Sequence, residues 1–164
     1  MTKYLRVTIV DAEEMNLGDY NTFKNWTIPE DEDPKKEGFK VTYEDQDPPH
    51  ISFCPKEVFE SRSLPLQDPK GISIMPEDLN NMVKEVSALP IPERMTVMAQ
   101  MDLKSGFFHY DYETADDPEK YKLETLTHIA TSKLYEKLFT MMRFVLKWAN
   151  NGLNHEIKEQ SNDT

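Results

Sequence analysis

Residues 94–149 decide the fold, and they begin RMTVMAQMDLKSGFFHYDYET. Every second side chain from Met95 to Leu103 is apolar, which is the period of a half-buried strand. The next residues are Lys104-Ser105-Gly106. Because glycine readily adopts positive φ, these residues predict a hairpin turn.

Residues 107–113 predict the return strand of this hairpin, and its two faces differ in chemistry. One face is aromatic and carries Phe108, Tyr110 and Tyr112. The other face is polar and carries His109, Asp111 and Glu113. We expect the aromatic face to pack beneath a helix and the polar face to lie in water.

A long helix is predicted after the hairpin. Asp117-Pro118-Glu119 is a typical helix start, and Gly152 is a suitable C-terminal cap. An apolar arc of about 100° forms along this helix at its period. It consists of Leu123, Ala130, Leu134, Leu138, Met141, Val145 and Ala149. Covering the hairpin with this arc would bury both apolar surfaces, as an isolated hairpin requires.

Basic side chains share another arc of the same helix, about 120° wide. They are Lys122, Lys133, Lys137, Arg143 and Lys147. This stripe is the expected polar side of a helix, or else an anion-binding surface for phosphates or an acidic partner.

The remaining chain predicts a small N-terminal α+β module and a linker. We expect strands at residues 4–10, 38–43 and 51–53, with a helix capped by Asn16 that stops near Trp26. Pro and Gly mark a linker over residues 61–71, and a helix is predicted from Pro76 to residue 86. The predicted fold class is therefore α+β, with domains at 1–66 and 72–153 and a flexible tail at 154–164.

Composition restricts the kinds of partner. The chain has 164 residues and a formal net charge of −11, which disfavours direct binding of nucleic acid. The single cysteine, Cys54, excludes an internal disulfide. No apolar run has the length of a signal peptide core or a membrane span, so we expect a protein without a membrane partner.

Acidic side chains gather in three segments, which we predict to be a partner-binding surface. They are Glu30, Asp31, Glu32 and Asp33; Glu44, Asp45 and Asp47; and Asp111, Glu113 and Asp116. A basic site on another protein would complement these carboxylates. The run of four at residues 30–33 lacks the alternate spacing of a calcium loop.

Catalytic and metal-binding patterns are absent from the sequence. It has no His-Glu-x-x-His, phosphate-binding loop, dinucleotide-binding or G-x-S-x-G motif. The trio of His109, Asp111 and Glu113 could ligate a metal or transfer protons, but no second cluster completes a site. We therefore expect no enzyme activity, no metal and no cofactor.

Two stretches resemble proteins of tailed bacteriophages. The first includes MNLGDYN from Met15, WTIPEDEDP from Trp26 and PKEVF from Pro55, and it resembles an N-terminal module common in small phage proteins. The second includes LKSGF from Leu103 and DPEKY from Asp117. It is similar to a family of small tailed-phage proteins named after genes forty-nine and sixty-six of two phages.

The resemblance extends over residues 11–63 and 72–149, and the chain departs from it at two places. Tyr110-Asp111-Tyr112 is bulkier than the usual small residues after the hairpin, and Phe53-Cys54 replaces an aromatic-Ser pair. The resemblance implies a phage or prophage protein that acts in the host bacterial cytoplasm, and it supplies no activity.

We accordingly expect a non-enzymatic accessory protein that binds and inhibits a host factor. The host factor would be a protein, for example a nucleic-acid-binding protein or part of a defence system. Two alternatives remain open. The basic stripe could bind a nucleotide signal and sequester it, or the long helix could mediate a homo-oligomer in a structural or assembly role.

Overall fold

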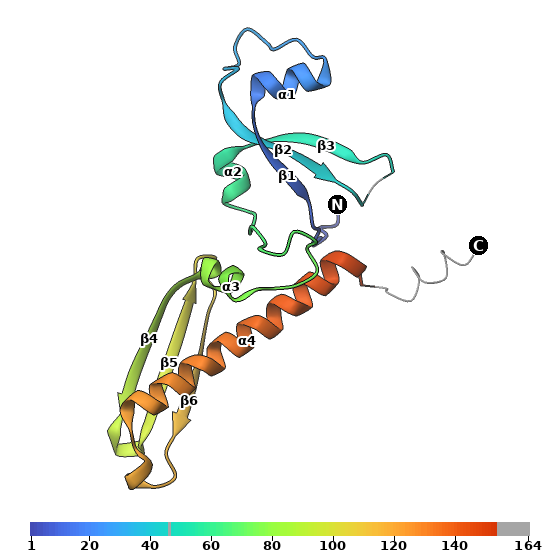
Figure 1. The fold of residues 1–164 in the computed structure, drawn as a ribbon. Coiled ribbons are helices and arrows are strands. Elements are labelled where there is room, and N and C mark those ends of the chain that lie inside the picture. The colour runs from blue at the N-terminus through green and yellow to red at the C-terminus, as the bar shows by residue number, and fades with distance from the viewer. Residues whose placement is uncertain (46, 154–164) are drawn as a thin grey trace, which may run out of the picture. The chain divides into compact units, whose positions relative to one another are not determined.

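The computed structural model describes residues 1–45 and 47–153, and its fold is mixed α+β (Figure 1). The chain divides into two compact units. One is built from Met1–Leu64 together with residues 148–153, and the other from Pro65–Lys147. The tail predicted at residues 154–164 lies outside the described residues.

The first unit contains a three-stranded antiparallel sheet in the order β1-β2-β3. The strands are β1 (Asp11–Asn16), β2 (Glu37–Tyr43) and β3 (His50–Pro55), with helix α1 (Leu17–Lys24) after β1 and α2 (Lys56–Glu60) after β3. Asn16 caps α1 as predicted, because its side-chain oxygen accepts from the backbone N–H of Asp19 at 2.8 Å. Tyr20 of α1 is buried, and its hydroxyl donates to the carbonyl of Ile51.

The first strand begins later than predicted. Residues 4–10 are not a strand, and pairing starts with Asp11 opposite Thr42. The antiparallel partner β2 ends at Tyr43, so residues before Asp11 have almost no partner strand left. Aliphatic and β-branched composition alone therefore gave the wrong strand.

The second unit contains a three-stranded antiparallel sheet in the order β4-β5-β6. It consists of β4 (Val83–Ile91), β5 (Thr96–Leu103) and β6 (Phe108–Thr114). We predicted a hairpin of two strands preceded by a helix reaching residue 86. Helix α3 (Pro76–Met82) instead ends at Met82, and the chain then pairs with β5 from Val83 to Ile91.

Pairing with β5 explains why the predicted helix is cut short. Residues from Val83 onward pair with nearly the whole length of β5, so β5 satisfies the backbone groups that a further helical turn would otherwise have to satisfy. Pro90 is compatible with this strand because β4 lies at the edge of the sheet. A short 3₁₀ helix, η1 (Pro92–Arg94), joins β4 to β5.

Strand β5 and helix α4 (Leu123–Asn151) form the core of this unit (Figure 1). The alternation in β5 is confirmed, since Val97, Ala99, Met101 and Leu103 are buried and the residues between them are partly exposed. The buried side chains of α4 are Leu126, Ala130, Leu134, Leu138 and Leu146. The predicted arc was therefore right at its centre, whereas Leu123 and Met141 are exposed.

The long helix begins later than the predicted start at Asp117-Pro118-Glu119, whereas its C-terminal end agrees with the predicted cap at Gly152. Asp117 accepts from the N–H of Glu119 and caps a 3₁₀ turn, η2 (Pro118–Lys120), two residues before α4 begins. At the other end, Gly152 has φ of 71° and its N–H donates to the carbonyl of Trp148.

The orientation predicted for β6 is wrong. Its side chains at His109, Asp111 and Glu113 are partly buried and face α4, whereas Phe108, Tyr110 and Tyr112 are 57–59% exposed. The tight turn explains this result, because it pairs Leu103 with Phe107 through the Phe107 carbonyl. Opposite residues in antiparallel strands share a face, so the odd-numbered residues of β6 must follow Leu103 toward the helix.

Candidate functional site

A polar seam joins β6 to α4 on the helix-facing side of the sheet. Lys133 Nζ lies 2.6 Å from Glu113 Oε2, and Lys137 Nζ lies 2.5 Å from Asp111 Oδ2. The carboxylates are two residues apart on a strand, about 6.8 Å, and the lysines are four apart on a helix, about 6 Å. Because these spacings match, both ion pairs form together.

The seam also occupies the open edge of β6. In β6, the backbone groups of the odd-numbered residues form hydrogen bonds with β5. The backbone N–H and C=O of Tyr112 therefore point away from β5. The Tyr112 N–H donates to Asp111 Oδ1 at 2.8 Å, and the Tyr112 carbonyl accepts from Lys133 Nζ at 3.1 Å. A strand added at this edge would have to displace both contacts, so the seam protects the edge from pairing with another chain.

The ion pairs shift the pKa values of Asp111 and Lys133. Burial opposes ionisation of Asp111, but hydrogen bonds from Lys137 and the Tyr112 N–H outweigh it and lower the pKa of Asp111. For Lys133, the hydrogen bond to Glu113 is the largest influence and raises its pKa, although desolvation acts in the opposite direction. Both groups therefore keep their charges over a wider pH range than usual.

A pocket of about 520 Å³ opens beside the seam. Its lining comes from β6 and its turn and from α4: Phe107, His109, Asp111, Lys133, Glu136, Lys137, Thr140 and Met141. His109 Nε2 lies 3.2 Å from the Leu134 carbonyl, which can only accept, so Nε2 carries the hydrogen. The buried Nδ1 of His109 has no hydrogen-bond partner among the described residues.

The basic stripe predicted on α4 is not a free cationic surface. Lys133 and Lys137 are neutralised by the seam, and Arg143 lies over the Phe139 ring at 5.6 Å. Lys122 and Lys147 are exposed, and Lys122 lies just before the first residue of α4, not on the predicted helix. A phosphate that bound Lys133 and Lys137 would compete with Glu113, Asp111 and the Tyr112 carbonyl for their ammonium groups.

The acidic residues predicted to bind a partner lie in different environments. Asp111 and Glu113 belong to the seam, and Asp116 pairs with Lys120 at 3.1 Å. The four carboxylates of residues 30–33 are exposed before β2, and those of residues 44–47 follow its end. Seven strand residues, about 20 Å, separate these two groups, so β2 keeps them apart.

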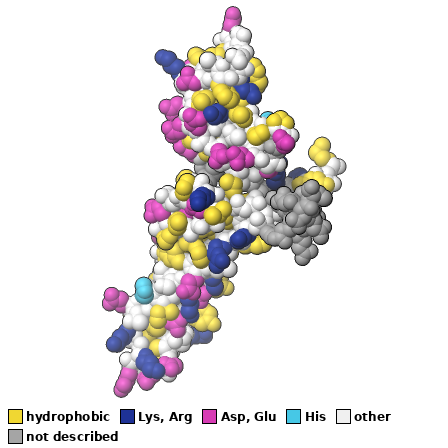
Figure 2. Space-filling model, turned by 45° about the vertical axis from the view of Figure 1, so that its right-hand side comes forward, with side chains coloured by type: hydrophobic (Ala, Val, Ile, Leu, Met, Phe, Trp, Pro, Cys, Tyr) yellow, Lys and Arg dark blue, Asp and Glu magenta, His cyan; other side chains and the backbone are white. Residues whose placement is uncertain are grey.

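Acidic side chains nevertheless remain prominent on the first unit, as Figure 2 shows. Glu30, Asp31 and Glu32 have no ion-pair partner within residues 1–45 and 47–153, whereas Asp45 pairs with Arg6. The side chain of Asp33 accepts from the N–H of Lys35.

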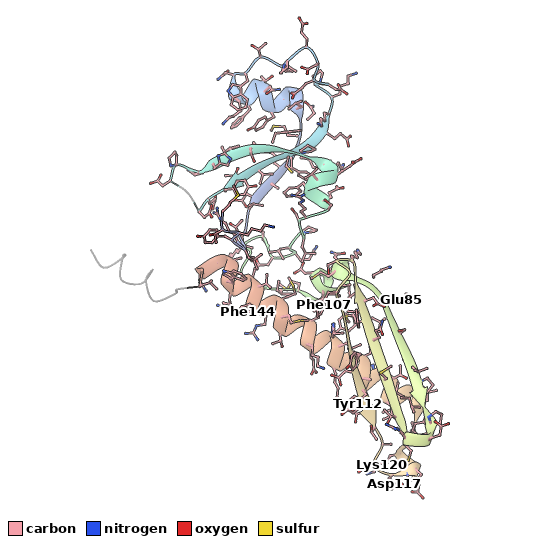
Figure 3. The ribbon with its side chains drawn as sticks, turned by 180° about the vertical axis from the view of Figure 1, so that it is seen from behind. Glu85, Phe107, Tyr112, Asp117, Lys120 and Phe144 are labelled. Atoms are coloured by element: carbon pink, nitrogen blue, oxygen red, sulfur yellow. The ribbon has the colours of Figure 1, made fainter. Side chains whose placement is uncertain are left out.

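The outer face of the β4-β5-β6 sheet is the surface that our sequence analysis missed. Tyr112, Met98 and Leu89 form one cross-strand row, and Tyr110, Gln100 and Ser87 form the next. Leu89 is 55% exposed, and Phe108, Tyr110 and Tyr112 are exposed to a similar extent. Figure 3 marks Tyr112 on β6 and Glu85 on β4, at the two edges of this sheet. The sequence shows the turn but not its register, and the pairing of Leu103 with Phe107 decides which face of β6 is covered.

No family model matches the chain, and no curated protein or solved structure shows a significant similarity to it. Within the described ranges, no group of three or more His, Cys, Asp or Glu side chains is arranged to hold a metal ion. Likewise, no helix in the described part of the chain is long and apolar enough to cross a membrane.

Proposed function

We propose that this protein is a non-enzymatic phage accessory protein that binds a host protein and inhibits it, with a bacterial defence system as the target class. The phage context and the site of action in the host bacterial cytoplasm rest on the sequence resemblance. The binding role rests on one structural observation, which is the uncovered aromatic face formed by Phe108, Tyr110 and Tyr112.

Aromatic exposure on this face supports binding for an energetic reason. The outward positions of a sheet with one free face are usually polar, because they remain in water. Here three neighbouring positions of β6 carry large rings that are more than half exposed. Tyrosine supplies much contact area with few rotatable bonds, and it is enriched among residues that dominate binding energy.

The overall charge supports a basic target. A net charge of −11 attracts a positively charged surface and repels nucleic acid. The proposal accordingly keeps the predicted complementarity between an acidic protein and a basic partner, but it moves the contact to the aromatic face.

Co-purification from host cells tests the proposal. A tagged chain should recover one host protein in stoichiometric amount, and a Tyr110→Thr/Tyr112→Thr variant should lose it. Tyr4→Thr is the matched control, because Tyr4 is also exposed but belongs to the other unit. Expression of the wild-type chain should relieve the host defence, and the double variant should not.

Three results would contradict the proposal. Recovery of the partner by the double variant would show that the aromatic face is dispensable. Release of a nucleotide without any protein would favour sequestration, and self-association without a partner would favour an assembly role.

A further inference from the structure

The outer face of the β4-β5-β6 sheet has a defined chemical composition. Twelve paired positions form it, four on each strand. They are Glu85, Ser87, Leu89 and Ile91 on β4, Thr96, Met98, Gln100 and Asp102 on β5, and Phe108, Tyr110, Tyr112 and Thr114 on β6. Six of these residues are aromatic or apolar, four are neutral and polar, two are carboxylates and none is Lys, Arg or His, so the face combines apolar surface with negative charge.

The two carboxylates are direct neighbours. Glu85 lies opposite Asp102 in the β4–β5 register, and like charges in such a cross-strand pair repel. Gln100 donates to both Asp102 oxygens, at 3.0 and 3.2 Å. No Lys or Arg forms an ion pair with Glu85 or Asp102 within the described ranges. A cation placed here would therefore relieve an existing repulsion.

The rings lie next to these carboxylates. Phe108 is the register partner of Asp102, and Tyr110 and Tyr112 continue along the same face of β6. Aromatic faces attract cations, and a guanidinium group binds them better than an ammonium group because it is planar and less strongly hydrated. One side chain of arginine can thus contact a ring and a carboxylate together.

We infer that this face receives a cationic, arginine-bearing segment of a partner protein. Arginine side chains lie on the rings of Phe108, Tyr110 and Tyr112 and pair with Glu85 and Asp102. The inference rests on the proposed function and specifies the chemistry of the partner.

The size of the face suits one segment. Three strands at about 4.8 Å spacing, each with about seven residues at about 3.3 Å, give a surface of about 14 by 23 Å. That accommodates a single extended segment or one helix of about 10 Å diameter. It is smaller than the roughly 800 Å² per partner of a standard interface between globular proteins.

Charge argues against two other occupants. A second copy of this face would add two further carboxylates to Glu85 and Asp102 and would supply no cation. A nucleic acid could stack bases on the rings, but stacking platforms work together with cationic grooves that hold the phosphates. None of the twelve positions supplies such a cation.

Titration of the full chain with three matched 15-residue peptides tests the inference. The peptides carry Arg, Lys or Glu at the same positions, and a single-stranded oligonucleotide is the fourth probe. We expect the Arg peptide to bind most tightly, with the largest NMR shifts on the rings of Tyr110 and Tyr112. Neither the Glu peptide nor the oligonucleotide should shift these signals.

Variants separate the contributions of rings and charges. Tyr110→Thr/Tyr112→Thr should weaken binding of the Arg peptide at least about tenfold, whereas Tyr→Phe at both positions should retain most of it because the rings remain. Glu85→Gln/Asp102→Asn should weaken binding about fivefold and reduce its salt dependence. Glu124→Gln, an exposed carboxylate on α4, is the control and should change binding less than twofold.

Several outcomes would overturn the inference. These are equal binding of the Glu peptide or the oligonucleotide, absence of shifts with the Arg peptide, or a Tyr-dependent dimer in sedimentation. The host protein recovered by co-purification distinguishes the two proposals. If its binding requires the tyrosines but not Glu85 and Asp102, the proposed function stands and the cationic partner is wrong. If its binding ignores the tyrosines, the proposed function fails whatever the peptides do.

Discussion

Strands β5 and β6 alternate with the same period but present opposite chemistry to the helix. In β5 the helix-facing residues, such as Val97 and Met101, are apolar and fully buried. In β6 the helix-facing residues, such as Asp111 and Glu113, are charged and pair with lysines of α4. The difference teaches that register through the turn, and not hydrophobicity, decides which face of an edge strand is covered.

The largest loss of stability should come from truncating an apolar residue that is buried between β5 and α4. Leu134→Ala should lower the free energy of unfolding by about 2–5 kcal/mol, because Leu134 is completely buried beneath the sheet. Denaturant titration measures this loss. Leu123→Ala, at a 48% exposed position of the same helix, is the control and should cost much less. Equal losses would mean that the helix packs through a different face.

The ion pairs between β6 and α4 should contribute less to stability than the buried apolar residues do. A double-mutant cycle with Asp111→Asn and Lys137→Met should give a coupling energy of about 1 kcal/mol or less, since the Lys137 side chain is 54% exposed and solvent screens the pair. The same cycle with Glu124→Gln and Lys137→Met should give no coupling. A coupling as large as the Leu134 loss would contradict this ranking.

The pH dependence of the seam should be smaller still. The pKa of Asp111 is lowered in the folded state, so its contribution is present above the unfolded pKa and is lost as pH falls through the folded pKa. Stability should therefore fall more steeply below about pH 4 in the wild type than in Asp111→Asn. The pKa of Lys133 is raised, so its contribution disappears only as pH rises above the usual lysine range. Thermal unfolding at acid and at alkaline pH measures the contributions of Asp111 and Lys133. If the stability of the wild type and of Asp111→Asn fell in parallel at acid pH, the Asp111 contribution would be excluded.

The smallest change in stability should come from the aromatic face. Tyr110→Thr should change the free energy of unfolding by about 0.5 kcal/mol, because the ring is 59% exposed and threonine favours strands. A buried aromatic residue would cost about 3–5 kcal/mol on truncation. A loss of that size would mean that Tyr110 is buried and that the aromatic face of β6 is the covered one.

The sequence predicted most of the local structure of this protein. Strand β5, the glycine turn, the long helix with its C-terminal cap and the α1 cap at Asn16 all follow from signals within a few residues. Periodicity and capping are local properties, so they can be read from adjacent residues.

Contacts between distant residues decided the rest. Pairing with β5 ended the predicted helix at Met82, and the limited length of β2 left residues 4–10 without a partner strand. The helix and strand propensities of single residues do not account for pairing with strands that lie far away along the chain.

The candidate surface illustrates the same division. The sequence by itself determined that β6 has one aromatic and one charged face. Only the tertiary structure decided that Lys133 and Lys137 occupy the charged face, so that the rings are left in water. The physical reason is that the tight turn fixes the β6 register to β5, and the helix can cover only the face on which β5 is apolar.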